Sequence, residues 1–187
     1  QTRALEEIFI RSALPYKVMG GTKFYERAEI KDSMAYLITV ANPDDTLALR
    51  RILNTPKRGI GPATETQLAS YAEDNGFTFR DAMRDAASLG LGPKVTGAIL
   101  QLSALLDEAA AKIDPANPAG VASVADVLTF LLDGSGYLEV LRNSRDPQDE
   151  ARAENVDELV AVTREFARNN PDGTLVDFLT EESLVAA

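Results

Sequence analysis

The stretch Gly59-Ile60-Gly61-Pro62 recurs 31 residues further along the chain as Gly90-Leu91-Gly92-Pro93. Each copy stands between two segments with helical patterning, and the order helix, Gly-apolar-Gly turn, helix is typical of a helix-hairpin-helix. Glycine permits positive φ angles and close backbone approach, while the apolar residue between the glycines can anchor the turn in a core. The following helix begins with N–H groups that have no partner within the helix. The repeat therefore predicts an all-α, multi-helix domain with two hairpin turns.

Apolar residues recur at helical spacing through most of the chain. From Ile30 onward they repeat at i, i+4, i+7 and i+8, which predicts a helix that ends at Asn42-Pro43. The same patterning predicts helices over residues 45–53, 62–74, 79–88, 93–113, 124–133, 147–169 and 175–185. Prolines suited to a first turn and S/T-x-x-acid capping patterns support these starts: Pro62, Pro93, Pro147, Thr78 with Asp81, Ser123 with Asp126, and Thr174 with Asp177. We interpret Gly134-Ser135-Gly136-Tyr137 as a break between helices.

The first 21 residues differ from the rest. A short helix is predicted before Pro15, and the apolar stretch 16–19 is typical of a strand. A lone strand cannot satisfy its own edges, so this part is predicted to be the remnant of a domain that contains a sheet. The chain begins with a residue other than Met, which fits a piece of a longer protein. We expect the helical domain to occupy residues 22–187.

The composition excludes several functional classes. The 187 residues include 29 Asp and Glu against 19 Lys and Arg, which gives a net charge of −10, and they include no Cys and no His. This excludes thiolate nucleophiles, disulfides, Cys/His zinc sites and imidazole acid–base catalysis by these residues. Because no apolar run reaches about 18 residues and no basic-apolar leader occurs, we expect no membrane partner and an intracellular location.

The charge is unevenly distributed along the chain. Residues 1–60 carry ten basic and seven acidic side chains, whereas residues 61–187 carry nine and 22. Four cations lie within nine residues, before and inside the first hairpin turn: Arg50, Arg51, Lys57 and Arg58. Nucleic acid binds through Lys and Arg on a local surface. The net acidity therefore does not exclude nucleic acid but confines its binding to one edge of the domain.

The first hairpin turn is a candidate seat for phosphate groups. Free N–H donors and the positive end of the helix dipole converge where a helix begins, and nearby cations strengthen the attraction of an anion. We predict DNA contacts at eight residues of this hairpin: Arg51, Thr55, Lys57, Arg58, Gly59, Ile60, Gly61 and Thr64. For the second hairpin we favour a packing role and assign weaker contacts to Gly90, Gly92 and Lys94. Gly-x-Gly turns also join helices that bind nothing, so purely structural hairpins remain an alternative.

Other signatures of chemistry are weak. The acidic run from Asp146 to Glu158 is interpreted as a solvated helix face rather than a metal site. No G-x-x-x-x-G-K-[ST] phosphate loop occurs, so we expect no cofactor, no metal and no ATP hydrolysis for this chain alone. A helix-hairpin-helix glycosylase would need a catalytic carboxylate where Asp81 lies, but no second catalytic signature accompanies Asp81.

Three stretches closely resemble successive motifs of UvrD/PcrA-type superfamily 1 DNA helicases, in matching order and spacing. They are QTRALEE at residues 1–7, PYKVMGGTKFYERAEIKD at 15–32 and NTPKRGIG at 54–61. The resemblance continues through Ser135-Gly136-Tyr137 and ENVDEL at 154–159, so it covers essentially the whole chain. It is more specific than the hairpin repeat alone.

The resemblance implies that residues 1–21 are a helix-strand remnant of the α/β, RecA-like motor domain 2A and that residues 22–187 form the helical 2B subdomain. Arg3 then matches the arginine that reaches the γ-phosphate of ATP, with Gln1 beside it at the nucleotide. The other motor motifs are absent, so Arg3 is expected to be idle in this chain. The resemblance places Gly20-Gly21 at the connection about which 2B swivels, and two glycines suit a hinge. The alternative is that Gly20-Gly21 simply ends the strand.

The implied function is that of an accessory, regulatory module of an ATP-dependent 3′-to-5′ DNA helicase, which is not an enzyme by itself. Residues 55–61 match the family's hairpin that grips duplex DNA beside the unwinding junction. ATP and Mg²⁺ belong to the parent enzyme, which is implied to work in the bacterial cytoplasm at the nucleoid, with DNA repair among its processes. The implied partners are double-stranded DNA or a duplex/single-strand junction, the remaining helicase subdomains, and protein partners or a second copy. The alternative is an acidic helical module that docks proteins through its C-terminal half.

Overall fold

The computed structural model describes residues 23–186 and is helical throughout that part, with no strand between these two residues. This confirms the all-α prediction for the described chain. The helices are α3 (Ala28–Ala41), α4 (Thr46–Ile52), α5 (Pro62–Asn75), α6 (Phe79–Arg84), the 3₁₀-helix η1 (Ala86–Leu89), α7 (Pro93–Lys112), α8 (Val124–Ser135), α9 (Tyr137–Asn143), α10 (Pro147–Asn169) and α11 (Leu175–Ala186). Within the described range, none of these helices has both the length and the apolarity needed to cross a membrane. The predicted strand at 16–19, the Gly20-Gly21 hinge, Gln1 and Arg3 lie outside the described residues.

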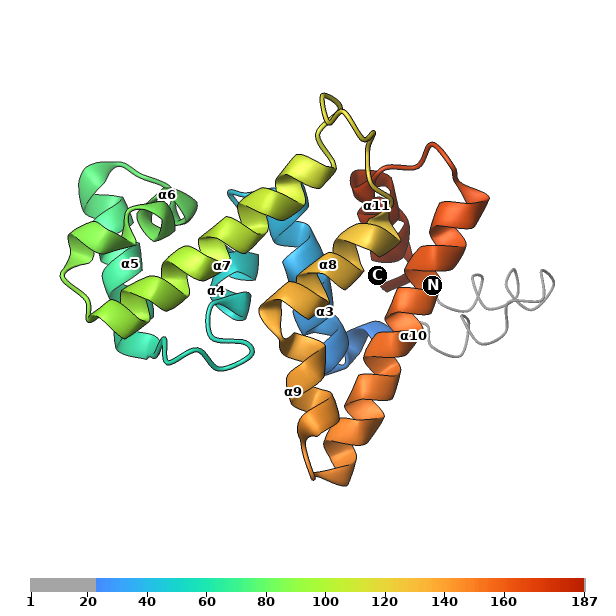
Figure 1. Cartoon of the computed structure of the whole chain (residues 1–187), viewed down its shortest axis with the longest axis horizontal. Helices are drawn as coiled ribbons and strands as arrows, with labels where there is room; N and C mark the ends of the chain where they lie inside the picture. The colour runs from blue at the N-terminus through green and yellow to red at the C-terminus, as the bar shows by residue number, and fades with distance from the viewer. Residues whose placement is uncertain (1–22, 187) are drawn as a thin grey trace.

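Helix α3 lies at the centre of the fold (Figure 1). It packs against α4, α8 and α10 and also contacts α7 and α11. Its side chains Ile30, Tyr36 and Leu37 are fully buried. Burial of one large apolar side chain contributes about 1.5–3 kcal/mol, so the residues of α3 supply much of the driving force for assembling the helices around it.

The two glycine turns lie toward one end of the molecule. Figure 1 shows α5 and α6 together at that end, with the long helix α7 running from them to the central helices. Helix α5 packs against α6, and α6 packs against α4 and α7. The turn that precedes α5 and the turn that precedes α7 therefore belong to the same part of the fold.

The capping residues lie where the sequence places them. Thr78 and Asp81 bond reciprocally: the Thr78 hydroxyl accepts from the Asp81 N–H at 3.0 Å, and the Asp81 carboxylate accepts from the Thr78 N–H at 3.4 Å. Thr174 and Asp177 make the same pair of bonds. The hydroxyl of Ser123 accepts a backbone N–H of α8. These bonds satisfy N–H groups that a helix start otherwise leaves without a partner.

Two helix predictions need correction, and the first concerns residues 79–88. The helix predicted there ends at Arg84 and is followed by η1, because Asp85 leaves the helical region with φ of −101° and ψ of 24°. The Asp85 carboxylate accepts hydrogen bonds from the hydroxyls of Tyr71 and Ser88. These bonds lower the pKa of Asp85 and tie it to α5.

The second correction is α9, which the sequence analysis did not predict. Gly136 breaks the helix as expected: with φ of 75° it ends α8, and its N–H bonds the carbonyl of Asp133. The chain enters α9 directly after it, and Tyr137 and Leu138 are buried. The seven residues of α9 span too few turns for a convincing apolar period.

Candidate nucleic-acid interface

The first glycine turn joins α4 to α5. Gly59 has φ of 80°, in the left-handed region that favours glycine. Ile60 is 2% exposed and packs in the core, which confirms its predicted role as an anchor. Gly61 is the N-cap of α5, and Pro62 is the first residue of that helix. The N–H groups that follow at the start of α5 have no partner within the helix.

The second glycine turn repeats this backbone geometry before α7. Gly90 has φ of 72°, Gly92 is the N-cap of α7, and Pro93 begins the helix. The apolar residue of the turn, Leu91, is only half-buried. The two turns therefore share their conformation and differ in how deeply the apolar residue is anchored.

The second glycine of each turn is not required by the fold. Gly61 has φ of −84° and Gly92 has φ of −61°, values that any residue adopts. A Cβ atom added at either position would meet no atom within 4 Å. Neither backbone strain nor packing explains glycine at these positions. Both glycines border open space at the beginning of a helix.

Two of the clustered arginines are engaged in ion pairs. Arg50 Nε lies 2.6 Å from a Glu65 carboxylate oxygen, and Arg51 Nε lies 2.8 Å from Asp32 Oδ1. Arg51 also donates to the carbonyl of Ala28 at 3.4 Å. The sequence analysis placed Arg51 among the DNA contacts, but in this structure its guanidinium is directed at α3.

Arg58 is engaged with the protein itself. Its Nη1 donates to three carbonyl oxygens at the end of α4, those of Ile52 (2.6 Å), Leu53 (3.1 Å) and Thr55 (3.3 Å). Its Nη2 donates to the hydroxyl of Tyr36 at 2.5 Å. Burial raises the pKa of Tyr36, and the neighbouring charge of Arg58 partly counteracts this. The Nη1 and Nη2 groups of Arg58 therefore bond within the protein, whereas its Nε makes no hydrogen bond with any of residues 23–186.

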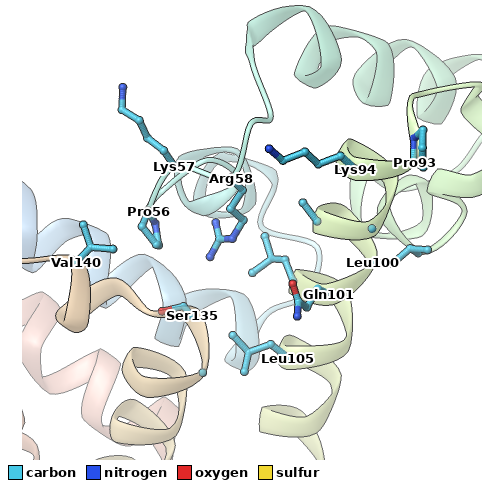
Figure 2. Close-up of a pocket in the computed structure, with 14 residues that line it drawn as sticks. Pro56, Lys57, Arg58, Pro93, Lys94, Leu100, Gln101, Leu105, Ser135 and Val140 are labelled. Carbon is cyan, nitrogen blue, oxygen red and sulfur yellow. The ribbon is translucent and has the colours of Figure 1, made fainter.

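Lys57 and Lys94 have no such engagement. Both side chains are exposed, and neither makes a hydrogen bond or ion pair with any residue between 23 and 186. They border the same cleft, which has a volume of about 860 Å³. Figure 2 shows Lys94 reaching from the start of α7 toward the side of the first turn, where Lys57 and Arg58 lie. The structure thus brings together one lysine from each hairpin.

Among residues 23–186, the cleft is lined by three cationic residues and by no acidic ones. Its lining comes from the first turn, from α7, from the junction of α8 and α9, and from α9: Pro56, Lys57, Arg58, Pro93, Lys94, Gly97, Ala98, Leu100, Gln101, Leu102, Leu105, Gly134, Ser135 and Val140. In a chain with a net charge of −10, this makes the cleft a local site of positive potential.

Sequence reasoning missed part of this cleft. Gln101, Ser135 and Val140 were not predicted to lie beside the glycine turns, and Val140 belongs to the unpredicted helix α9. Of the predicted contact residues, Thr55 uses its carbonyl to accept from Tyr36 and Arg58, and Thr64 is half-buried in the first turn of α5. At Ser135 the sequence signals were a helix break at residues 134–137 and the resemblance to a helicase motif, and neither indicated a position beside the glycine turns.

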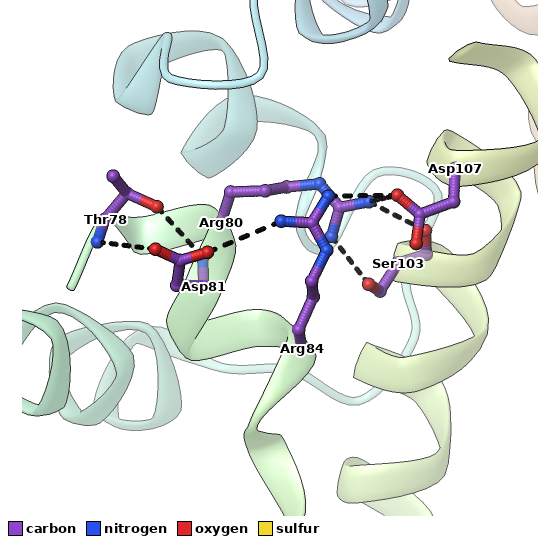
Figure 3. Close-up of polar contacts among 6 residues, drawn as sticks. All are labelled: Thr78, Arg80, Asp81, Arg84, Ser103 and Asp107. Atoms are coloured by element: carbon purple, nitrogen blue, oxygen red, sulfur yellow. Dashed lines mark hydrogen bonds and ion pairs between the residues drawn. The ribbon is translucent and has the colours of Figure 1, made fainter. Parts of the chain in front are cut away.

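A buried arginine of α6 ties that helix to α7 (Figure 3). Arg80 is 2% exposed; its Nη1 donates to Ser103 Oγ at 2.6 Å, and its Nη2 donates to Ser103 O at 2.9 Å and to Asp107 Oδ1 at 2.7 Å. Burial lowers the pKa of Arg80, and the charge of Asp107 acts against this. Arg84 reaches the same Asp107 oxygen at 3.0 Å from the surface and also pairs with Asp81. Asp81 therefore serves as a cap and an ion-pair partner.

Comparisons with known proteins identify the family of the chain. Residues 1–187 match the family described as UvrD-like helicase C-terminal domain. The chain is 37% identical over 186 residues to the ATP-dependent DNA helicase PcrA of Bacillus subtilis, covering 100% of this chain and 24% of that protein. It is 42% identical over 202 residues to the ATP-dependent DNA helicase UvrD1 of Mycobacterium tuberculosis, covering 99% and 25%. The chain thus spans about a quarter of the length of the curated relatives it matches. Because the family match extends over every residue, the chain belongs to the UvrD-like helicase C-terminal domain family.

Proposed function

We propose that this chain is the duplex-DNA-binding, regulatory 2B subdomain of an ATP-dependent 3′-to-5′ DNA helicase, with residues 1–21 as the adjoining end of motor domain 2A. The observation that carries the proposal is the cleft between the two glycine turns. It is bordered by Lys57 and Lys94, and within residues 23–186 these lysines are unengaged and no carboxylate lines the cleft. A cationic surface of this kind attracts phosphate groups even in an acidic protein.

Contact with phosphates uses two kinds of donor. The ammonium groups of Lys57 and Lys94 supply charge, and the N–H groups at the starts of α5 and α7 supply directed hydrogen bonds. Glycine at 61 and 92 leaves open space at these helix starts, so a phosphodiester backbone can approach closely. None of these groups reads base edges, so the binding is independent of sequence. The interface therefore positions a duplex or a duplex/single-strand junction.

In the parent enzyme, ATP and Mg²⁺ belong to motor parts outside this chain. The sequence has no phosphate loop, and residues 23–186 contain no group of three or more acidic side chains arranged to hold a metal ion. Of this chain we assign only Arg3 and Gln1 to the nucleotide, and Gly20-Gly21 to the hinge about which the helical part moves. The surrounding subdomains are its nearest partners.

Duplex binding by this chain is expected to weaken with salt in proportion to the phosphates it contacts. With two free lysines in the cleft, the slope of log K against log salt concentration is expected to be about −2, and Lys57→Ala is expected to bring it to about −1. Lys94→Ala tests the second hairpin in the same way. Fluorescence anisotropy with a labelled duplex at several salt concentrations measures both slopes.

The matched control is Lys31→Ala, which removes an exposed lysine that lines a different cleft. It is expected to leave the slope unchanged. A slope that stays at its original value in the Lys57→Ala/Lys94→Ala double variant refutes the proposed interface. Single-stranded and junction DNA and an acidic polypeptide serve as comparison ligands. Binding of the polypeptide as strong as that of the duplex favours the protein-docking alternative.

A further inference from the structure

Three polar residues on one stripe of α3 each bond to a different part of the fold. Glu29, Asp32 and Tyr36 are spaced i, i+3 and i+7, so they follow one side of the helix. At one end of the stripe, the buried Glu29 carboxylate accepts a hydrogen bond from Asn155 Nδ2 of α10 at 2.7 Å. The stripe therefore begins at a contact with α10.

Asp32 continues the stripe with two partners. Its Oδ2 accepts the hydroxyl of Tyr137 at 2.8 Å, and its Oδ1 accepts Arg51 Nε at 2.8 Å. Tyr137 begins α9, and Arg51 belongs to the last turn of α4. The carboxylate of Asp32 thus sets α9 and α4 in place relative to α3.

Tyr36 ends the stripe beneath the first glycine turn. Its hydroxyl donates to the carbonyl of Thr55 at 2.5 Å and accepts from Arg58 Nη2. Asn54 adds a second support from within the loop, because its Oδ1 accepts the N–H groups of Arg58 at 2.6 Å and Ile60 at 3.2 Å. The inner side of the loop is therefore hydrogen-bonded, and Lys57 is left pointing outward with no partner among residues 23–186.

We propose that Tyr36 and Arg58 are positioning residues of the first glycine turn, and that Arg58 is not a phosphate ligand. They hold the loop in the shape that presents Lys57 and the first N–H groups of α5 to a duplex. This inference rests on the proposed function, because it takes Lys57 as the phosphate ligand. Holding the loop in its bound shape before binding strengthens affinity, since less conformational freedom is lost when the duplex arrives.

The test compares Tyr36→Phe, Arg58→Lys, Arg58→Ala and Lys57→Ala in the full chain. Tyr36→Phe removes one oxygen and keeps the ring, while Arg58→Lys keeps the charge but loses the planar fork that bonds several oxygens. Both are expected to weaken duplex binding about three- to tenfold at fixed salt, with the salt slope unchanged. Lys57→Ala is expected to lower the slope. Wild-type affinity in Arg58→Lys, or a slope that falls in Arg58→Ala as it does in Lys57→Ala, overturns the inference.

A measurement without DNA tests the positioning role of Tyr36 separately from the proposed function. The backbone amides of Arg58 and Ile60 donate to Asn54 Oδ1. They are expected to exchange with deuterium about tenfold faster in Tyr36→Phe than in the original chain, because loss of the Tyr36 hydroxyl removes a hydrogen bond that holds the loop closed. Unaltered exchange overturns the positioning role. If Lys57→Ala leaves duplex binding unchanged, the proposed function fails, while the exchange rates still decide whether Tyr36 positions the loop.

Discussion

Arg80→Ala is expected to lower the free energy of unfolding by about 3 kcal/mol, and Arg84→Ala by less than about 0.5 kcal/mol. The two arginines bind the same oxygen of Asp107, at 2.7 Å and 3.0 Å. They differ in burial, because the side chain of Arg80 is 2% exposed and that of Arg84 is 47% exposed. Arg84→Ala is therefore a matched control, because it removes an exposed arginine that pairs with the same Asp107 carboxylate.

The large effect at Arg80 has three sources. The buried hydroxyl of Ser103 loses its hydrogen-bond partner, and a buried polar group without a partner costs about 1–3 kcal/mol. The carbonyl of Ser103 loses the Arg80 Nη2 donor. The buried methylene groups of Arg80 lose their packing. Asp107, which is 52% exposed, is rehydrated by water, so the expected effect is at the lower end of the range for breaking a buried ion pair.

Urea unfolding followed by circular dichroism measures both variants. The midpoint is expected to shift strongly for Arg80→Ala and little for Arg84→Ala, with the same slope against urea concentration in both. Equal shifts in the two variants contradict the argument, because they mean that the charge of the ion pair matters and burial does not.

The helices were largely predictable because local signals agree along this sequence. Apolar spacing, N-cap hydroxyls and first-turn prolines all indicate the same boundaries, as at Thr78 and Pro147. Prediction was incomplete where a tertiary contact decides the local structure. Helix α6 ends early at Asp85, whose carboxylate accepts hydrogen bonds from Ser88 nearby and from Tyr71 of another helix. The contact with Tyr71 cannot be inferred from the residues next to Asp85.

The candidate site was predictable in its backbone and less so in its charges. Positive φ at Gly59 and Gly90 and the buried anchor at Ile60 follow from the turn sequence. The clustering of cations in the sequence does not reveal which of them are engaged. The partner of Arg51, Asp32, lies 19 residues away, and only the packing of α4 on α3 brings the two together.

The shared cleft could not be predicted from local sequence patterns either. Lys57 and Lys94 lie in separate hairpins, and they border one cavity because α7 passes beside the first turn on its way to the central helices. Because Lys94 borders the same cleft as Lys57, the second hairpin is a stronger candidate for phosphate contact than the sequence around Lys94 indicates. Within the described part of the chain, by contrast, the acidic residues after position 60 contribute no carboxylate to this cleft.

Ile60→Ala is expected to lower the free energy of unfolding by about 3 kcal/mol, whereas Leu91→Ala is expected to lower it by only about 1 kcal/mol. Ile60→Ala is also expected to abolish the part of duplex binding that depends on the first turn. Both substitutions remove the same number of carbon atoms from the middle of a glycine turn. Ile60 is 2% exposed in the core, so its truncation leaves a cavity that the surrounding side chains cannot fill. Leu91 is half-buried, so its site is already partly open to water.

The comparison isolates depth of burial, because Gly59 and Gly90 adopt nearly the same φ and each turn leads into a helix that begins with proline. Urea unfolding of the two variants measures the difference, and duplex anisotropy on the folded fraction shows whether the first turn still presents Lys57. Similar losses of stability in the two variants contradict the argument that burial distinguishes the hairpins. A larger loss of stability for Ile60→Ala means that the buried side chain of Ile60 holds the first turn in place, together with the hydrogen bonds of Tyr36 and Arg58.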